Sequence, residues 1–242
     1  MTDPAVNASP DPSGGASAET SPGWGLAIEV SNPSAAVRGF GPSVAVARGD
    51  EVLASVPVGG AGQRGSDDLF PAIERARERA GVAVDALETV VVSIGPGGLT
   101  GLRVSVAAAA AIAEARGVAC VGVPTSRVAA VDEPAGTGIA LASKGERAWL
   151  AVVGNGGVSD VGEVDAGELG GQGLSRLVCD EHLPGRWREV AGAMGLELVP
   201  TRLSAERLWR CRGSVAACDA AALRVLYPRE PEAVRVWRER RG

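Results

Sequence analysis

The stretch LETVVVSIGPGGLTGLR, residues 87–103, decides the fold of this chain. Its first half is apolar and rich in β-branched residues, and such a run predicts a buried central strand over residues 87–94. Glycine and proline then dominate the stretch up to Gly101, directly before an alanine-rich run that ends at Gly117. This order predicts a strand, a tight glycine-rich turn, and a helix over residues 100–116.

The glycine-rich turn matches neither of two common phosphate-binding patterns. Turns between a strand and a helix often hold phosphate, because the helix N-terminus offers unpaired amide groups. A Walker-type loop needs a lysine directly after its last glycine, and none follows here. A dinucleotide fingerprint needs a third glycine where Thr100 stands. Both nucleotide hypotheses are therefore weak on the residues alone.

Elements on both sides of this stretch predict an α/β fold, with a mixed sheet and helices packed on it. Short apolar runs predict a strand and a following hairpin over residues 25–30, 43–47 and 52–56. A periodic apolar stripe, ended by a glycine, predicts a helix over residues 67–80. A further short buried strand is predicted over residues 119–123.

The second half of the chain shows the same kind of pattern more weakly. It predicts strands over residues 139–142, 148–153 and 174–179, a short helix over 187–194, and one or two helices within 205–226. Residues 154–173 are rich in glycine and show no clear period, so we expect irregular structure there.

Three units follow from these patterns. Residues 1–22 consist mainly of Pro, Ser, Ala, Asp and Gly, which predicts a disordered tail. We expect an N-terminal lobe over residues 23–125 and a smaller, less regular C-terminal lobe over residues 126–242.

Composition excludes several classes of protein. The net charge of -5 argues against binding nucleic acid through the overall field of the protein. The four cysteines lie far apart without a CxxC pair, and His182 is the only histidine, so the pattern indicates neither a zinc site nor a disulfide framework. No stretch is long and apolar enough to span a membrane, and no secretory signal is visible. We therefore expect a cytoplasmic protein that does not bind membranes.

The helix expected over residues 100–116 is apolar in nearly every direction. Such a helix needs a sheet on one face and a second cover on the other. The helix over residues 67–80 of the same chain is one candidate cover. A partner subunit that packs closely against the small alanine side chains is the other.

The glycine-rich turn and its surroundings resemble the TsaB (YeaZ) family. The family signature reads GPGSFTGLR, followed by a helix and then Gly-Val-x-Ser or a close variant. This chain has GPGGLTGLR over residues 95–103, with Gly98 and Leu99 where the family has Ser and Phe, and GVACVGVPTS over residues 117–126. The resemblance extends back through residues 81–87 to the opening strand at residues 26–29, and it thins in the second lobe.

This resemblance implies a two-lobed actin/sugar-kinase/Hsp70-like (ASKHA) fold, with mixed sheets flanked by helices. It implies a non-catalytic dimerisation subunit of the tRNA N6-adenosine threonylcarbamoyltransferase complex, which modifies the adenosine next to the anticodon. The partners would be a TsaD-like catalytic subunit, a TsaE-like ATPase and, through the complex, tRNA; a homodimer stays open. In the family, the two helices that match residues 67–80 and 100–116 form the interface with TsaD. The expected interface residues here are Leu69, Ile73, Leu99, Thr100, Arg103, Val104, Ala107, Ala108 and Ala111.

An ATP-dependent enzyme of the same fold is the alternative. Catalytic members of the fold hold an Asp after the first strand, near the metal of the nucleotide, and Glu29 stands at that position here. TsaD-like enzymes also use paired histidines as metal ligands, whereas this chain has one histidine in its second lobe. We therefore expect no catalytic residue, metal or cofactor, and leave open a weak residual affinity for nucleotide.

Two further features have competing interpretations. Ser66, followed by Asp67 and Asp68, is either a helix cap or a serine nucleophile; no base lies near it in sequence, which favours the cap. The basic run over residues 235–241 would contact tRNA phosphate or an acidic partner surface, or it is a solvated helix end.

Overall fold

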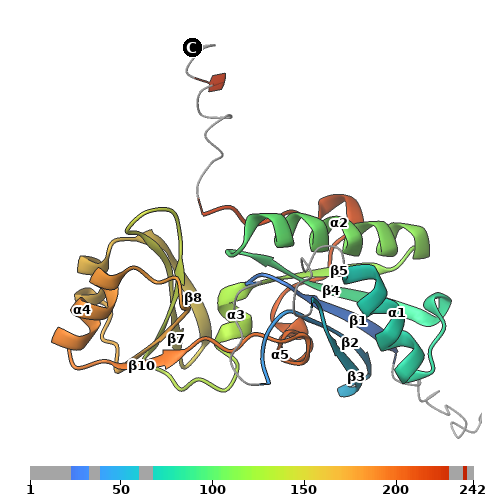
Figure 1. The fold of residues 1–242 in the computed structure, drawn as a ribbon, viewed down its shortest axis with the longest axis horizontal. Helices are drawn as coiled ribbons and strands as arrows, with labels where there is room; N and C mark the ends of the chain where they lie inside the picture. Colours follow the sequence, from blue (N-terminus) through green and yellow to red (C-terminus); the bar gives the residue numbers. More distant parts are fainter. Residues whose placement is uncertain (1–22, 33–38, 60–67, 229–236, 239–242) are drawn as a thin grey trace, which may run out of the picture.

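The computed structural model describes residues 23–32, 39–59, 68–228 and 237–238, which form two five-stranded sheets (Figure 1). The expected tail over residues 1–22, together with Ser66, Asp67 and most of the basic run over residues 235–241, lies outside the described residues. No helix in the described part of the chain is both long and apolar enough to cross a membrane.

The first sheet contains the strands predicted around the glycine-rich turn, in the order β3-β2-β1-β4-β5. Its strands are β1 (Trp24–Glu29), β2 (Ser43–Arg48), β3 (Glu51–Pro57), β4 (Leu87–Gly95) and β5 (Ala119–Pro124). Strands β1, β4 and β5 are parallel, and β2 pairs antiparallel with β1 and β3, which confirms the predicted mixed sheet and hairpin. The carboxyl ends of β1, β4 and β5 therefore lie at one edge.

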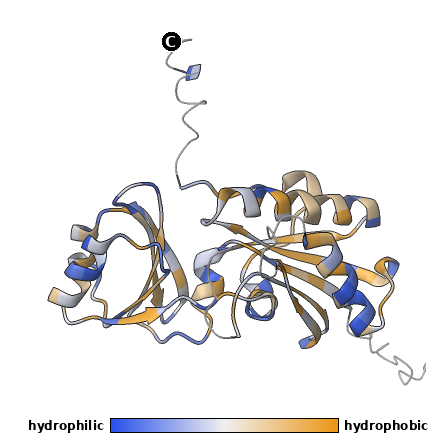
Figure 2. Cartoon of the chain, viewed as in Figure 1, coloured by the Kyte–Doolittle hydropathy of each residue, from blue (hydrophilic) through white to orange (hydrophobic). Residues whose placement is uncertain are grey.

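Two helices cover one face of this sheet (Figures 1 and 2). Helix α1 (Leu69–Ala80) packs on β2 and β3, whereas α2 (Leu99–Arg116) packs mainly on β4. Both helices end at a glycine in the left-handed conformation, Gly81 and Gly117, as the sequence predicted. Because β3 and β4 both run toward the same edge before a helix, α1 and α2 begin at that edge and run parallel.

The second sheet has the order β10-β9-β6-β7-β8, which repeats the neighbour relations of the first. Its strands are β6 (Thr137–Ala142), β7 (Ala148–Gly154), β8 (Gly157–Val164), β9 (Arg176–Cys179) and β10 (Glu197–Pro200). Helix α4 (Gly185–Ala193) packs on it through the buried side chains of Trp187 and Ala191. The shared topology gives the chain its two lobes.

The expectation of irregular structure over residues 154–173 was wrong, because β8 lies there. Strand β8 is an edge strand in which only Val164 is buried, so it lacks the apolar alternation that marks a half-buried strand. The short elements α3 (Thr125–Ala129) and β10 were not predicted either. In the region expected to hold one or two helices, α5 (Ala205–Arg210) is followed only by short 3-10 turns.

The opposite face of the first sheet meets the second sheet through α3 and α5. One apolar cluster joins residues of both sheets, including Ala27, Val91, Ile139 and Val178. Helix α5 contacts β1, β2, β3 and β4, although it follows the whole second sheet in the sequence. The boundary at residue 125 stays a prediction, and the segment that begins with α5 returns to the first sheet.

Candidate functional site

Gly97 and Gly101 of the turn over residues 95–101 are required by the close approach of the backbone of the protein itself. A Cβ at Gly97 would lie 2.2 Å from the carbonyl oxygen of Ser31, and one at Gly101 would lie 2.7 Å from that of Val30. The amide of Gly98, at the N-cap of α2, donates to the Ser31 carbonyl at an N···O distance of 2.6 Å. The turn thus fastens the end of β1 to the start of α2, and this amide is not free for a phosphate.

Glu29 lies at the end of β1 and is only 1% exposed. Its Oε1 accepts hydrogen bonds from the Ser31 amide at 2.8 Å and the Ser31 hydroxyl at 2.5 Å. Its Oε2 has no hydrogen bond of normal geometry to any described residue. Burial raises the pKa of the Glu29 carboxyl above its ordinary value of 4.5, while the bonds from Ser31 and a weaker interaction with Ser93 lower it. The net upward shift favours the neutral acid.

Helix α5 packs on the face of β1 to which Glu29 belongs. The indole of Trp209 lies on Gly25 so closely that a Cβ there would stand 2.0 Å from the ring. At the end of α5, burial raises the pKa of the Cys211 thiol to about 12, and the charge of Glu29 contributes to that shift. Cys211 therefore lies near Glu29. Glu29, the residue expected at a degenerate nucleotide site, is thus enclosed within the protein.

The expected interface residues on α2 divide between its two faces. Leu99 is 44% exposed, and Thr100, Arg103, Ala107 and Ala111 are also exposed. Val104 is half-buried, and Ala108 is 4% exposed, within the core between α2 and the sheet. Since residues 107 and 111 are one turn apart, they form a stripe of small side chains along the outer face.

Two other expected interface residues, Leu69 and Ile73 on α1, are also buried in the core of the first sheet. A residue that already packs inside the chain cannot form an open surface for a partner. With Ala108, these residues support the two helices from within. Leu69 and Ile73 belong to the inward stripe that the periodicity of α1 predicted.

Two further aromatic residues, one at the start of α1 and one beside Arg103 of α2, are exposed and were not among the expected interface residues. Phe70, in the first turn of α1, is 57% exposed. Phe70 lies outside the apolar stripe by which α1 faces the core. A large apolar residue at such a position in the sequence was the signal that could have identified it as exposed. Tyr227 is 37% exposed, and its hydroxyl accepts a hydrogen bond from Nε of Arg103 at 3.3 Å. No local pattern predicts that pairing, because 124 residues separate the two positions.

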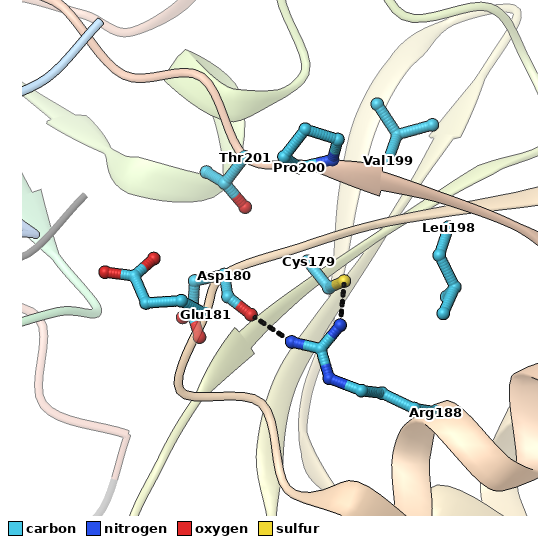
Figure 3. Close-up of a pocket in the computed structure, with 8 residues that line it drawn as sticks. All are labelled: Cys179, Asp180, Glu181, Arg188, Leu198, Val199, Pro200 and Thr201. Carbon is cyan, nitrogen blue, oxygen red and sulfur yellow. Dashed lines mark hydrogen bonds between the residues drawn. The ribbon is translucent and has the colours of Figure 1, made fainter. Parts of the chain in front are cut away.

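A second candidate site is a hollow of about 290 Å³ at the carboxyl ends of β9 and β10 (Figure 3). Its lining includes Cys179, Asp180, Arg188 and Thr201. Asp180 is 7% exposed, and its two carboxylate oxygens accept backbone hydrogen bonds from Ala142 at 2.8 Å and His182 at 2.9 Å. The hydroxyl of Thr201 is buried without a hydrogen-bond partner among the described residues.

The charged groups of this hollow are held by neighbouring groups of the same chain. Arg188 of α4 donates to the Asp180 carbonyl at 3.0 Å and approaches the Cys179 sulfur at 3.8 Å (Figure 3). Burial raises the pKa of the Cys179 thiol and of the Asp180 carboxyl. A neutral thiol is a poor nucleophile, so the arrangement does not point to a catalytic cysteine in this hollow. The ring of His182 lies 3.5 Å from the Glu181 carboxylate at the exposed rim.

Comparisons with known proteins agree with this architecture. The family described as TsaD, tRNA N6-adenosine threonylcarbamoyltransferase, matches residues 59–167. A solved structure of an uncharacterized protein with similarity to peptidase YEAZ from Pseudomonas aeruginosa has a TM-score of 0.61 and 18% identity, covering 86% of this chain and 100% of its own. YeaZ from Pseudomonas aeruginosa has a TM-score of 0.58 and 18% identity, covering 85% and 99%. No curated protein matches the sequence. The two structures confirm the predicted two-lobed ASKHA-like fold.

Proposed function

Since the TsaD-type domain and the YeaZ-like fold support its assignment to the TsaB (YeaZ) family, we propose that this chain is a non-catalytic subunit of the tRNA N6-adenosine threonylcarbamoyltransferase complex. In this proposal it binds a TsaD-like catalytic subunit and supports modification of the adenosine next to the anticodon. A TsaE-like ATPase completes the complex, and tRNA binds to the complex through the TsaD-like subunit. The observation that carries the proposal is the exposed small-residue face of α2.

The proposed partner-binding face consists of exposed residues of α2 together with Phe70 of α1. It combines small side chains, which let a second helix pack closely, with exposed apolar side chains that a partner could cover. Ala107 and Ala111 are exposed near the middle of α2, so a second helix could come unusually near its axis. Phe70 and Leu99 stand exposed in the first turns of α1 and α2, which begin at the same edge of the sheet. Exposed large apolar residues beside a small-residue stripe are typical of a protein interface. Arg103 adds a charged group to the same face.

The surroundings of Glu29 support a scaffold over an ATP-dependent enzyme. A carboxyl group that binds the metal of a nucleotide must be ionised and within reach of the ligand. Glu29 is enclosed, and burial raises its pKa. The Gly98 amide, where a phosphate would bind at the start of α2, donates to Ser31. The expected result is that the purified chain neither hydrolyses ATP nor cleaves peptides. Turnover that disappears in Glu29→Ala would contradict this expectation.

A binding experiment with alanine-to-glutamate variants tests the partner-binding face. Ala107→Glu and Ala111→Glu should each weaken binding to the TsaD-like subunit from the same cell at least about tenfold, or about 1.4 kcal/mol, because a charge would be buried between two helices. Calorimetry measures the affinity, and circular dichroism checks that the variants fold. Ala193→Glu is a matched control, since Ala193 is exposed on α4 of the other lobe.

The outcomes separate the alternatives. Folded Ala107→Glu and Ala111→Glu variants that bind the partner like the unaltered chain would exclude this face as the interface. Ala108→Glu should lose its fold instead, because Ala108 is in the core. Analytical ultracentrifugation of the chain alone tests whether a second copy occupies the same face. A dimer dissociated by Ala107→Glu would show that it does.

A further inference from the structure

Cys120 and Cys218 stand opposite each other in an isolated antiparallel pair outside the two regular sheet ladders. The Cys120 amide donates to the Cys218 carbonyl at 2.9 Å, and the Cys218 amide donates to the Cys120 carbonyl at 2.8 Å. Residues that exchange both backbone bonds have Cα atoms about 5.5 Å apart. Cysteines joined by a disulfide usually have Cα atoms about 4.4–6.8 Å apart. The Cα separation therefore lies within the range of disulfides. The Cβ atoms of a hydrogen-bonded pair are about 5.5 Å apart, so they would have to approach each other by about 1 Å for the bond to form.

The two side chains lie on the same side of this pair. Directly opposite residues of antiparallel segments point to the same face, and both cysteines contact the apolar core under α2. Burial raises the pKa of the Cys120 thiol to about 11, and the neighbouring Cys218 adds to that shift, as expected for thiols close in space. Cys120 is fully buried and Cys218 is half-buried, so Cys218 is the thiol that solvent reaches.

We propose that Cys120 and Cys218 are a site of reversible oxidation to an intramolecular disulfide, with a low-molecular-weight disulfide as oxidant. The Cys218 thiolate attacks one sulfur of the small disulfide, and the other sulfur leaves as a thiolate. Cys120 gives its proton to the first small thiolate and attacks the Cys218 sulfur, which releases the second small thiolate; burial raises the pKa of Cys120, so this step is the slow one. One protein disulfide and two small thiols result, so the oxidant takes up the two electrons and the two protons.

The disulfide would fasten a segment that borders the partner-binding face. After Cys218, the turn Ala220–Ala222 packs on α2, and the Leu226 amide donates to the Ile94 carbonyl at 2.8 Å. The segment then brings Tyr227 to Arg103. Oxidation would tie the start of this segment to β5 and restrict its movement over α2. That consequence rests on the proposed function, whereas formation of the disulfide does not.

The other two cysteines provide internal controls. Cys211 is buried near Glu29, and its sulfur lies 3.3 Å from the carbonyl oxygen of Leu208. Cys179 lies in the second sheet, beside Arg188. Neither is paired across strands with another described cysteine. Oxidation should therefore be specific for the pair of Cys120 and Cys218.

The experiment exposes the full chain to excess oxidised glutathione, quenches it with acid, alkylates free thiols, and maps the peptides without reduction. A linked Cys120–Cys218 peptide is expected, with a rise of about 5 °C in Tm that dithiothreitol reverses. Cys218→Ser should abolish both, and Cys211→Ser should keep both. A stable glutathione adduct on Cys218 without the linked peptide, or the same rise in Tm in Cys218→Ser, would overturn the proposal.

A second measurement tests the link to the partner-binding face. Oxidised and reduced chains are compared for affinity to the TsaD-like subunit, with Cys218→Ser carried through the same treatment. A difference of at least about threefold that is absent in Cys218→Ser supports the coupling. Equal affinities would overturn the coupling. If neither form binds that subunit, the proposed function fails, and the peptide map still decides whether the disulfide forms.

Discussion

The two sheets share one strand order, yet they differ where their parallel strands end. In the first sheet, Glu29 is enclosed near α5, with one carboxylate oxygen lacking a normal hydrogen bond to the described residues. In the second, both oxygens of Asp180 accept backbone hydrogen bonds, and a hollow lies beside it (Figure 3). One topology thus supports a sealed edge and an open one. The difference comes from the segments that cover each edge, so the function must be argued from the edge and not from the fold.

The largest expected effect is at the sealed edge. Gly97→Val should destabilise the protein by about 3 kcal/mol or more, because its Cβ would stand 2.2 Å from the Ser31 carbonyl oxygen and the backbone would have to move. Urea denaturation measures the change. Gly167→Val in the second lobe is the control, since a Cβ at Gly167 meets no atom within 4 Å, and it should cost less than about 1 kcal/mol. An unchanged urea midpoint for Gly97→Val would show that the sealed edge is not tightly packed.

A smaller loss is expected at the open edge from Asp180→Asn. The carboxylate accepts two backbone hydrogen bonds, whereas the amide of Asn has only one acceptor atom. The partly buried amide of Ala142 or that of His182 would then face the NH2 group of Asn, at a cost of about 1–3 kcal/mol. Chemical denaturation at neutral pH measures the loss. A variant as stable as the unaltered chain would indicate that water reaches these amides through the hollow.

Glu29→Gln should stabilise the protein, by an amount that depends on pH. Because burial raises the folded-state pKa of Glu29, the stability that its protonated form contributes is complete below about pH 4.5 and is lost as pH rises through the folded-state pKa. Each pKa unit of that rise corresponds to about 1.4 kcal/mol. The variant lacks this loss, so its stability relative to the unaltered chain should increase from pH 4.5 toward neutrality. Thermal unfolding across this range checks the trend, and a difference in Tm that stays constant with pH would contradict it.

The smallest effect is expected for Thr201→Val in the hollow. Its buried hydroxyl has no hydrogen-bond partner among the described residues, so its removal should change the free energy of unfolding by less than about 1 kcal/mol. Urea denaturation measures this change, with Thr137→Val as a second case of a buried, unpartnered hydroxyl. A clear loss for Thr201→Val alone would indicate an ordered water bound to this hydroxyl in the hollow.

Much of the first sheet could be predicted because its signals are local. The apolar run of β4, the glycine-rich turn and the left-handed glycines that end α1 and α2 depend on residues close together in the chain. The second sheet was harder, because its edge strand β8 has few apolar residues and its short strands carry little periodicity. The candidate face was predicted on both helices, with Ala107, Ala108 and Ala111 among its residues. The burial pattern leaves Ala107 and Ala111 exposed and assigns Ala108 to the core.

The sequence by itself determined the order of elements around residues 87–103, the positions where the two main helices end, and the absence of a standard phosphate-binding motif in the turn. Only the tertiary structure decided which face of α2 stays open, because a helix that is apolar in every direction carries no sign of its own orientation. It also decided that α5 returns to the first sheet near Glu29 and that Cys120 meets Cys218. These contacts join residues about 100 to 180 positions apart, and they depend on how the chain packs as a whole and not on any local propensity.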